Sequence, residues 1–387
     1  MNSKRIMIGS EERALLLLSG LKALPGAGEA LAAIASPERF VWLANEHGVA
    51  GFVKRNLKES GLSDVLPSTE YQNLRNQSFK SIARNAFIMT ALNEAALLLN
   101  KGGIVPVLLK GTALEVTVYE KSGLRPMTDA DILLPKDDCL RAWNMLKAAG
   151  FKSLPYKSPL YKLIPLHIGK HLPSLIKGGF SLEIHHSLFW GKGQDVTNQM
   201  IKGATGGIAN AAQQGAKAEV VVPPAGLHFL YLVSHLVKHE LDNDSQLRLY
   251  NDLAAIIAYY PTEMVLEGAM ESAPKTGMEV HLRNKLGLLR KYMGVELPEK
   301  YHFEPSVEAE ESFLRFLGSP KNNEPVNKKA FYRETVGAVP GLHRKLVFIT
   351  GDISPGFKFM KKRYGKRTIL GVVPYYFYRL GKLTWLI

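Results

Sequence analysis

The chain has a single cysteine and no long apolar run. Cys139 stands alone, so an intrachain disulfide framework and any zinc or iron–sulfur site built on several cysteines are excluded. No stretch approaches the roughly 20 apolar residues that span a bilayer. The apolar run at 14–18 is too short for the core of a signal peptide. We therefore expect a cytoplasmic protein without a transmembrane segment.

Acidic residues are also in short supply. The chain has 35 Asp and Glu against 49 Lys and Arg, which gives a net charge of +14 and favours anionic partners. Residues 341–387 carry ten of the basic residues and one acid, Asp352, interleaved with aromatic residues. This tail suits single-stranded RNA, an acidic protein or an anionic membrane surface, with the protein then peripheral at the inner membrane face. The alternative is that its aromatic residues pack on a helical domain while its lysines stay in solvent.

Length and local patterns predict several regions, because 387 residues with 46% hydrophobic content exceed one typical domain. Apolar residues at helical spacing fill the first hundred residues and return after Pro223-Pro224. Between them, 191–222 is rich in Gly, Ala, Gln and Asn without a clear period. The sequence thus predicts an N-terminal helical region (1–103), an α/β core (104–190), a linker or mobile loop (191–222), a C-terminal helical domain (223–340) and a basic aromatic tail (341–387).

The core region alternates strand and helix signals. A β-branched apolar run at 104–109 predicts a buried strand, and a helix should follow at 112–119. A second strand is expected at 129–134, with a helix after it that Gly150 ends. Two further apolar segments, 171–176 and 180–185, flank Gly178-Gly179 and predict a β-hairpin.

Three acids give the core its chemistry. Asp129 and Asp131 stand two apart in a predicted strand, so their side chains leave the same face about 7 Å apart. Glu183 lies in an apolar strand, where a lone carboxylate is costly unless it is paired or bound to metal. Hard oxygen ligands on one face select Mg²⁺, or Mn²⁺, and leave positions for phosphate oxygens. A solvated strand end is the common explanation of an isolated Asp-x-Asp, so the third acid decides the interpretation.

Two further segments could bind a nucleotide. Lys110-Gly111-Thr112 closes one predicted strand and opens a helix, where free backbone N–H groups can receive phosphates. This tripeptide lacks the spacing of a P-loop, and Lys110 could equally be a surface lysine. Arg125, just before the acids, offers a fork of donors for phosphate, or pairs locally within a turn.

In order and spacing, these segments resemble the uncharacterised bacterial nucleotidyltransferase family labelled NTP_transf_5, of the DNA polymerase β superfamily. The residues that carry the resemblance are Leu109-Lys110-Gly111, Leu114, Tyr119, Gly123-Leu124-Arg125-Pro126, Asp129-Ala130-Asp131-Ile132-Leu133-Leu134, Leu146, Gly150-Phe151 and Leu182-Glu183-Ile184-His185. The match is strongest over 104–186 and continues more weakly through 247–253.

The resemblance implies an α+β fold, with a polymerase β-like core of a small mixed sheet and helices, flanked by N- and C-terminal helical regions. It implies transfer of a nucleoside monophosphate from an NTP, with ATP the favoured nucleotide, to an acceptor hydroxyl. Asp129, Asp131 and Glu183 match the metal-binding and catalytic acids, and Gly111-Thr112 stands where the superfamily usually has Gly-Ser. The acceptor stays open between a protein, an RNA end, a metabolite and a sugar.

Two other functions use the same residues. A binding module could keep the fold without catalysis and dock on RNA or an anionic membrane, and a metal-dependent phosphohydrolase could use the same acids.

His185, two residues after Glu183, could support the metal ligands or be a packed histidine. Arg248 and Asp252 are four apart, so an ion pair within one helix is their simplest explanation, although the resemblance includes them.

One pair of histidines does not complete the zinc-protease motif that its spacing suggests. His235 and His239 have the spacing of a His-Glu-x-x-His motif, but Leu236 replaces its glutamate.

Overall fold

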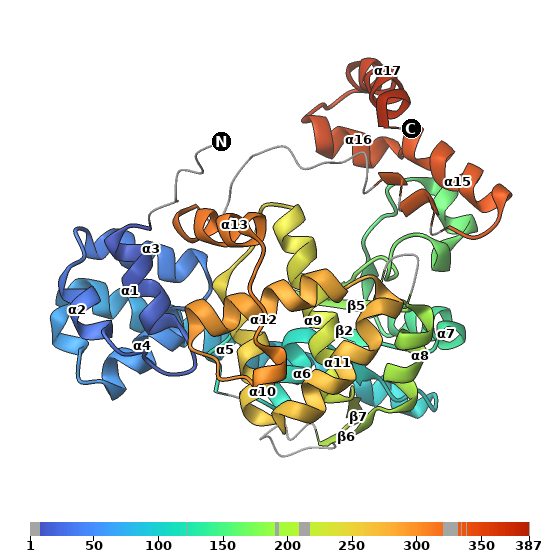
Figure 1. Cartoon of the computed structure of the whole chain (residues 1–387). Coiled ribbons are helices and arrows are strands. Elements are labelled where there is room, and N and C mark those ends of the chain that lie inside the picture. The colour runs from blue at the N-terminus through green and yellow to red at the C-terminus, as the bar shows by residue number, and fades with distance from the viewer. Residues whose placement is uncertain are drawn as a thin grey trace.

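The computed structural model describes residues 8–120, 122–189, 193–208, 217–319, 332–333, 335–337 and 339–386. Within these ranges the chain forms a mixed sheet between two helical regions, and a smaller group of helices near the C-terminus projects from the body (Figure 1). The fold is α+β, as expected.

The N-terminal region is helical. Ser36 and Pro37 show how its helices begin, because the Ser36 hydroxyl accepts from the Arg39 amide at 3.1 Å and proline occupies the first helical position. Apolar faces of these helices form one core with the later helical domain. The elements are α1 (Ser10–Ser19), α2 (Ala27–Ala32), α3 (Pro37–Glu46), α4 (Ala50–Glu59), the 3₁₀ helix η1 (Ser63–Val65) and α5 (Ser68–Lys101).

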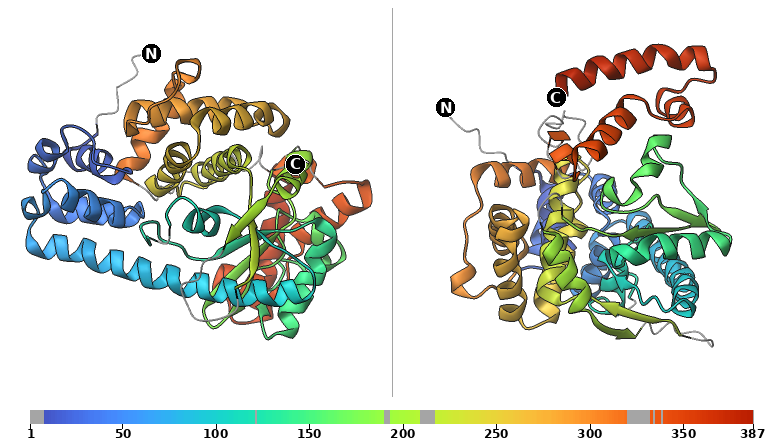
Figure 2. Two further views of the ribbon diagram at one scale, coloured as in Figure 1. Left: turned by 90° about the horizontal axis from the view of Figure 1, so that it is seen from below. Right: turned by 90° about the vertical axis from the view of Figure 1, so that its right-hand side faces the viewer.

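Helix α5 links the N-terminal helices to the sheet and runs along one side of the molecule (Figure 2). Among the described residues it is the one helix long and apolar enough to cross a membrane, by length and composition only. A third of its apolar window is buried, and Asn85 within it donates to the Arg125 carbonyl at 2.8 Å and accepts from the Met127 amide at 3.0 Å. These two hydrogen bonds of Asn85 tie α5 to the loop before β2.

The central sheet has seven strands among the described residues, in the order β3-β4-β5-β2-β1-β7-β6. β2 and β5 are parallel neighbours, and β1 pairs antiparallel with β2 and parallel with β7. The hairpin is confirmed, because β4 and β5 pair antiparallel around Gly178 and Gly179, both at positive φ. The strands are β1 (Val107–Leu108), β2 (Ala130–Leu133), β3 (Lys152–Ser153), β4 (Leu175–Lys177), β5 (Phe180–His185), β6 (Thr205–Ile208) and β7 (Glu219–Val222).

Two helices connect these strands as the sequence predicts. α6 (Lys110–Val116) follows β1, and α7 (Lys136–Ala148) follows β2 and ends before Gly150, which has a φ of 92°. The connection from β3 to β4 holds two 3₁₀ helices, η2 (Pro159–Leu163) and η3 (Pro165–His167).

The stretch 191–222 differs from the expected linker. It contains α8 (Gln194–Lys202), β6 and β7, and β7 lies inside the sheet beside β1; residues 191–192 and 209–216 lie outside the described ranges. Within the expected linker, Val220-Val221-Val222 is a β-branched run typical of a strand, but its pairing with β1 is long-range and cannot be deduced from the local sequence.

The C-terminal helical domain covers the sheet with an apolar set of helices. α9 and α11 approach closely at Gly226, where a Cβ atom would lie 2.8 Å from the Val265 carbonyl. The helices are α9 (Ala225–Leu241), α10 (Leu247–Tyr259), α11 (Thr262–Thr276), α12 (Glu279–Met293), η4 (Glu299–Tyr301) and α13 (Val307–Gly318).

The basic tail forms three helices, α15 (Leu342–Ile353), α16 (Phe357–Tyr364) and α17 (Ile369–Leu386). α15 packs on η2 of the β3–β4 connection, where Phe348 stacks on Tyr161 with ring centroids 5.8 Å apart. Phe348 of the tail thus packs on that connection, whereas Tyr364 and Tyr375 stack on each other and Phe377 is exposed.

Candidate active site

Two neighbouring parallel strands bring two of the acids together. Asp131 of β2 is the register partner of Glu183 of β5, so both side chains leave the same face of the sheet side by side. The strands are otherwise buried and apolar, with Ile132 and Ile184 paired one step further on. The Asp-x-Asp and Leu-Glu-Ile segments therefore meet where the sequence predicts.

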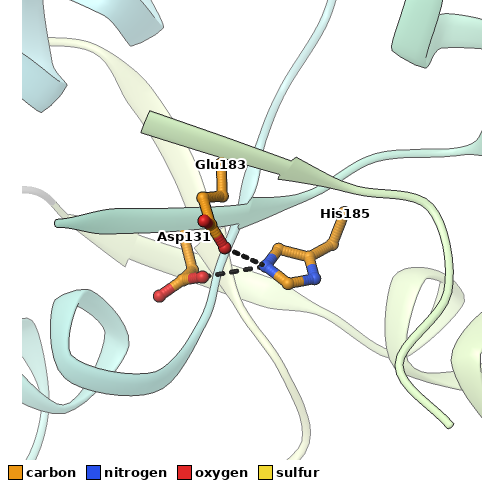
Figure 3. A group of neighbouring side chains, drawn as sticks. All are labelled: Asp131, Glu183 and His185. Atoms are coloured by element: carbon orange, nitrogen blue, oxygen red, sulfur yellow. Dashed lines mark hydrogen bonds and ion pairs between the residues drawn. The ribbon is translucent and has the colours of Figure 1, made fainter. Parts of the chain in front are cut away.

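His185 lies between these carboxylates (Figure 3). Its Nε2 atom is 2.8 Å from Asp131 Oδ1 and 3.6 Å from Glu183 Oε2. The ligand atoms of these three residues all lie within 4.8 Å of one another, which makes them a group able to share one cation. The structure brings together Asp131, Glu183 and His185, and for His185 the sequence left open a supporting position or a packed histidine.

Lys110 contacts the same oxygen of Asp131. Leu109 donates its amide to the Asp131 carbonyl at 3.0 Å, and Lys110 then turns into α6 with a φ of 46°, unusual for a residue with a side chain. Its Nζ atom lies 2.7 Å from Asp131 Oδ1. Burial alone would lower the pKa of Lys110, but the Asp131 charge outweighs it and raises that pKa. Lys110 is accordingly a charged residue of the site, not a surface lysine.

The same contacts determine the charge of Asp131. Its side chain is 6% exposed, and burial by itself would raise its pKa. The Lys110 charge and the hydrogen bond from His185 outweigh burial and hold the pKa of Asp131 well below its usual range. Asp131 is thus an anion whose charge is balanced by two nitrogen groups.

Glu183 has its own partners on the hairpin. The Ser174 hydroxyl donates to Oε1 at 3.0 Å, and His171 Nε2 lies 3.6 Å from Oε2. Burial would raise the pKa of Glu183, but the nearby imidazoles of His185 and His171, each 3.6 Å from Oε2, lower it. These contacts therefore also favour the ionised form of Glu183.

Asp129 lies just before β2 and outside the closely spaced group. The Thr128 hydroxyl donates to its Oδ1 at 3.1 Å, and within the described residues no Lys, Arg or His comes within ion-pair distance of it. Burial and the Asp131 charge raise the pKa of Asp129. Asp129 is thus the carboxylate of the site whose charge is least compensated, a condition that a bound cation relieves.

Gly111 and Thr112 serve the turn that carries Lys110. A Cβ atom on Gly111 would lie 2.4 Å from Arg125 Nη1, so only glycine leaves room for the guanidinium there. The Thr112 hydroxyl is buried and donates to the Leu109 carbonyl at 2.8 Å. α6 has only seven residues, so its helix dipole is weak at this turn, and nucleotide binding by Lys110, Gly111 and Thr112 stays a prediction.

Arg125 is buried beneath this turn. Its Nε atom lies 2.9 Å from both carboxylate oxygens of Asp252 on α10, and the Tyr119 hydroxyl donates to Asp252 at 3.0 Å. Its guanidinium is committed to this pair, which ties the loop before β2 to the helical domain. A direct contact of Arg125 with phosphate stays a prediction.

The expected ion pair between Arg248 and Asp252 is replaced by a longer-range one. Asp252 pairs with Arg125 instead, and Arg248 Nη1 donates to the Pro126 carbonyl at 3.3 Å. Burial and the nearby Arg125 charge lower the pKa of Arg248 to about 10. Helical spacing alone did not reveal that the Arg125 guanidinium competes for Asp252.

One face of α9 lies toward the acids. Tyr231, His235 and His239 recur every four residues, and the rings of His235 and His239 are 4.5 Å apart. Burial lowers the pKa of His235 well below its usual value, and the nearby Lys110 charge lowers it further. This face thus brings the neutral imidazole of His235 near Lys110 and Asp131, whereas His239 pairs with Asp244 at 2.7 Å.

Sequence reasoning missed His171, Ser174 and Tyr231. The hairpin register offered a signal for the first, since His171 forms an isolated bridge with His185 across from β5. Ser174 and Tyr231 had no comparable signal, because their places depend on how the β3–β4 connection and α9 pack.

The donor set fits a hard divalent cation. Asp131 and Glu183, whose pKa values are lowered, and Asp129, which has no cationic partner within ion-pair distance among the described residues, supply oxygen ligands. His185 adds a nitrogen ligand. A cavity of about 520 Å³ lies elsewhere, between the end of α1, α10 and the end of α12, and none of these acids lines it. The chemistry of the protein therefore points to the sheet and not to that cavity.

One of three comparisons with known proteins finds a match. No curated protein and no solved structure matches the chain. The family model NTP_transf_5, described as an uncharacterised nucleotidyltransferase, matches residues 35–294, about two thirds of the chain, from the residues before α3 to the end of α12. The chain therefore belongs to this nucleotidyltransferase family.

Proposed function

We propose that the protein transfers a nucleoside monophosphate from an NTP, with ATP the expected nucleotide, to a hydroxyl group of an acceptor. The acceptor oxygen forms a bond to the α-phosphorus, the bond from that phosphorus to the bridging oxygen breaks, and pyrophosphate leaves. The hydroxyl proton passes to a carboxylate of the site, Asp131 or Glu183. Membership of the family supports this class of reaction.

The observation that carries the proposal is the register of Asp131 with Glu183 on parallel β2 and β5, with Asp129 just before β2. Asp131 and Glu183 share one face of the sheet, and Asp129 lies on the same chain segment as Asp131, just before that strand. Two acids of one segment with one of its neighbour are the arrangement that holds one or two divalent cations beside a triphosphate. The Asp131 charge already raises the pKa of Asp129, and a bound cation would relieve this repulsion.

Each charged residue then has a role. Asp129, Asp131 and Glu183 would hold Mg²⁺, or Mn²⁺, with His185 beside them, and this cation would neutralise phosphate charge and align the reacting groups. Lys110, 2.7 Å from Asp131, would bind a phosphate oxygen. The pair of Arg125 with Asp252 positions the Lys110–Gly111 turn from beneath.

The test follows the α-phosphate. The protein is incubated with each NTP radiolabelled at that phosphate, with Mg²⁺ or Mn²⁺ and a lysate of the host, and Asp129→Asn/Asp131→Asn is compared with wild type. The matched control is Asp137→Asn/Asp138→Asn on α7, where the same two charges are removed from a surface position. Transfer of label to a macromolecule or metabolite by wild type and control, but not by the site variant, is the expected result.

Other results point to the other functions. Release of phosphate from the nucleotide without transfer of label would indicate a phosphohydrolase. Absence of transfer, together with absence of metal-dependent NTP binding in calorimetry, would leave a non-catalytic binding module.

A further inference from the structure

The helices α15–α17 form a small unit that is separate from the family-matched part of the chain. The match ends at residue 294, before this unit begins. α16 and α17 pack on each other around Met360 and Val372, both fully buried (Figure 1). The unit thus has its own packing and needs its own explanation.

This unit is firmly attached to the body. Asp352 of α15 pairs with Lys157 and accepts a hydrogen bond from the Tyr161 hydroxyl at 2.9 Å. Arg379 of α17 donates to the Asp352 carbonyl at 2.9 Å. These contacts hold the three helices on the β3–β4 connection, whose far end carries His171 and Ser174 beside Glu183.

One face of α17 is apolar and exposed. Its large apolar residues recur at intervals of three and four, and Leu370 and Phe377 are 84% and 71% exposed. The inner face of the same helix holds Val372, Tyr376 and Arg379. The outer stripe consists of Ile369, Leu370, Val373, Phe377 and Leu380.

Positive charge gathers at the N-terminal end of this stripe. Lys366 and Arg367 immediately precede α17, and Lys362 and Arg363 end α16; all four are exposed. The tail 341–387 has ten basic residues against one acid. An exposed apolar stripe beside a dense basic cluster is the pattern of a helix that lies in the interface of an anionic membrane.

The aromatic residues favour a membrane over single-stranded RNA. RNA bases stack on open aromatic rings. Here Tyr364 and Tyr375 stack on each other at 4.2 Å, Lys366 covers the Tyr375 ring at 5.6 Å, and the Tyr376 hydroxyl donates to the Pro355 carbonyl. The exposed stripe is instead mainly aliphatic, which suits acyl chains.

We propose that α16 and α17 form a docking surface for anionic lipid bilayers, with the stripe of α17 entering the acyl boundary and the basic cluster contacting lipid headgroups. The surface would hold the β3–β4 connection, and with it one side of the acidic site, close to the bilayer.

The test uses the full chain and sedimentation with vesicles. Wild type should bind vesicles of phosphatidylserine with phosphatidylcholine at least about tenfold more tightly than vesicles of phosphatidylcholine alone, and rising salt should weaken this binding. Leu370→Ser/Phe377→Ser should weaken it by about tenfold or more. Lys366→Glu/Arg367→Glu should remove the preference for phosphatidylserine. The matched control is Val280→Ser/Val307→Ser, two exposed aliphatic positions of the helical domain, which should bind like wild type.

Three results would overturn the proposal. Wild type could stay in the supernatant with both kinds of vesicle. The Leu370→Ser/Phe377→Ser variant could sediment like wild type while circular dichroism shows the same helix content. The protein could bind a single-stranded oligoribonucleotide more tightly than anionic vesicles, which would make the tail an RNA surface.

Discussion

Replacing Asp252 with asparagine should destabilise the protein strongly. Asp252 and its partner Arg125 are 1% and 5% exposed, with Nε 2.9 Å from both oxygens. The variant leaves a buried guanidinium without an opposing charge, which typically costs about 3–5 kcal/mol. A domain is stable by only about 5–15 kcal/mol, so this loss is readily measured by urea unfolding.

A double-mutant cycle identifies the partner of Asp252. The structure predicts a coupling energy of at least about 2 kcal/mol between Arg125→Met and Asp252→Leu, because the two charges are buried together. Arg248→Met with Asp252→Leu should show less than about 1 kcal/mol, since the Arg248 guanidinium bonds elsewhere. The two cycles share one substitution, so each is a control for the other.

Two results would refute this reasoning. Asp252→Asn could cost less than about 1 kcal/mol, which is the range of an exposed pair. Alternatively, the Arg248 cycle could give the larger coupling, which would restore the ion pair within one helix that residue spacing suggests.

Three further predictions follow from single contacts. Gly111→Ala should destabilise the protein by about 1–3 kcal/mol and weaken NTP binding, because the added Cβ would displace the Arg125 guanidinium. The control Gly268→Ala should be tolerated, since its Cβ would make only an ordinary contact at 3.5 Å. Thermal unfolding measures the stability of both variants, and nucleotide titration measures their NTP binding. Burial lowers the pKa of His47 to about 4, so the stability that its neutral form contributes is present above about pH 6.5 and is lost as pH falls towards 4. Between about pH 7.5 and pH 5 this loss is about 2 kcal/mol, and it should be absent from His47→Gln in urea unfolding at the two pH values. Lys110→Gln should weaken NTP binding by about tenfold or more in calorimetry while the protein stays folded, and unchanged affinity would remove Lys110 from the phosphate site.

The parts of the fold that sequence predicted rest on local signals. Gly178 and Gly179 at positive φ set the hairpin, and the alternation of apolar residues with Asp131 and Glu183 placed both acids in strands. Their order along the chain, together with the family resemblance, was enough to place these two acids near each other. β7 escaped prediction because its pairing with β1 joins segments more than a hundred residues apart.

The rest of the site depends on packing between distant segments. Arg125 and Asp252 are 127 residues apart, and nothing near either one indicates the other. The spacing of His235 and His239 showed that they share a helix face, but not that this face lies toward Lys110. The basic composition of the tail does not distinguish single-stranded RNA from an anionic membrane as its partner. The argument for a membrane uses the mutual stacking of Tyr364 and Tyr375, which the sequence does not show.

The central claim is that the face shared by β2 and β5 binds a divalent cation. Electron paramagnetic resonance of Mn²⁺, titrated into the protein with a non-hydrolysable ATP analogue, tests it most directly. Wild type and Asp137→Asn should bind Mn²⁺, and Asp131→Asn/Glu183→Gln should lose at least about tenfold in affinity. Equal Mn²⁺ binding by the Asp131→Asn/Glu183→Gln variant would contradict the account.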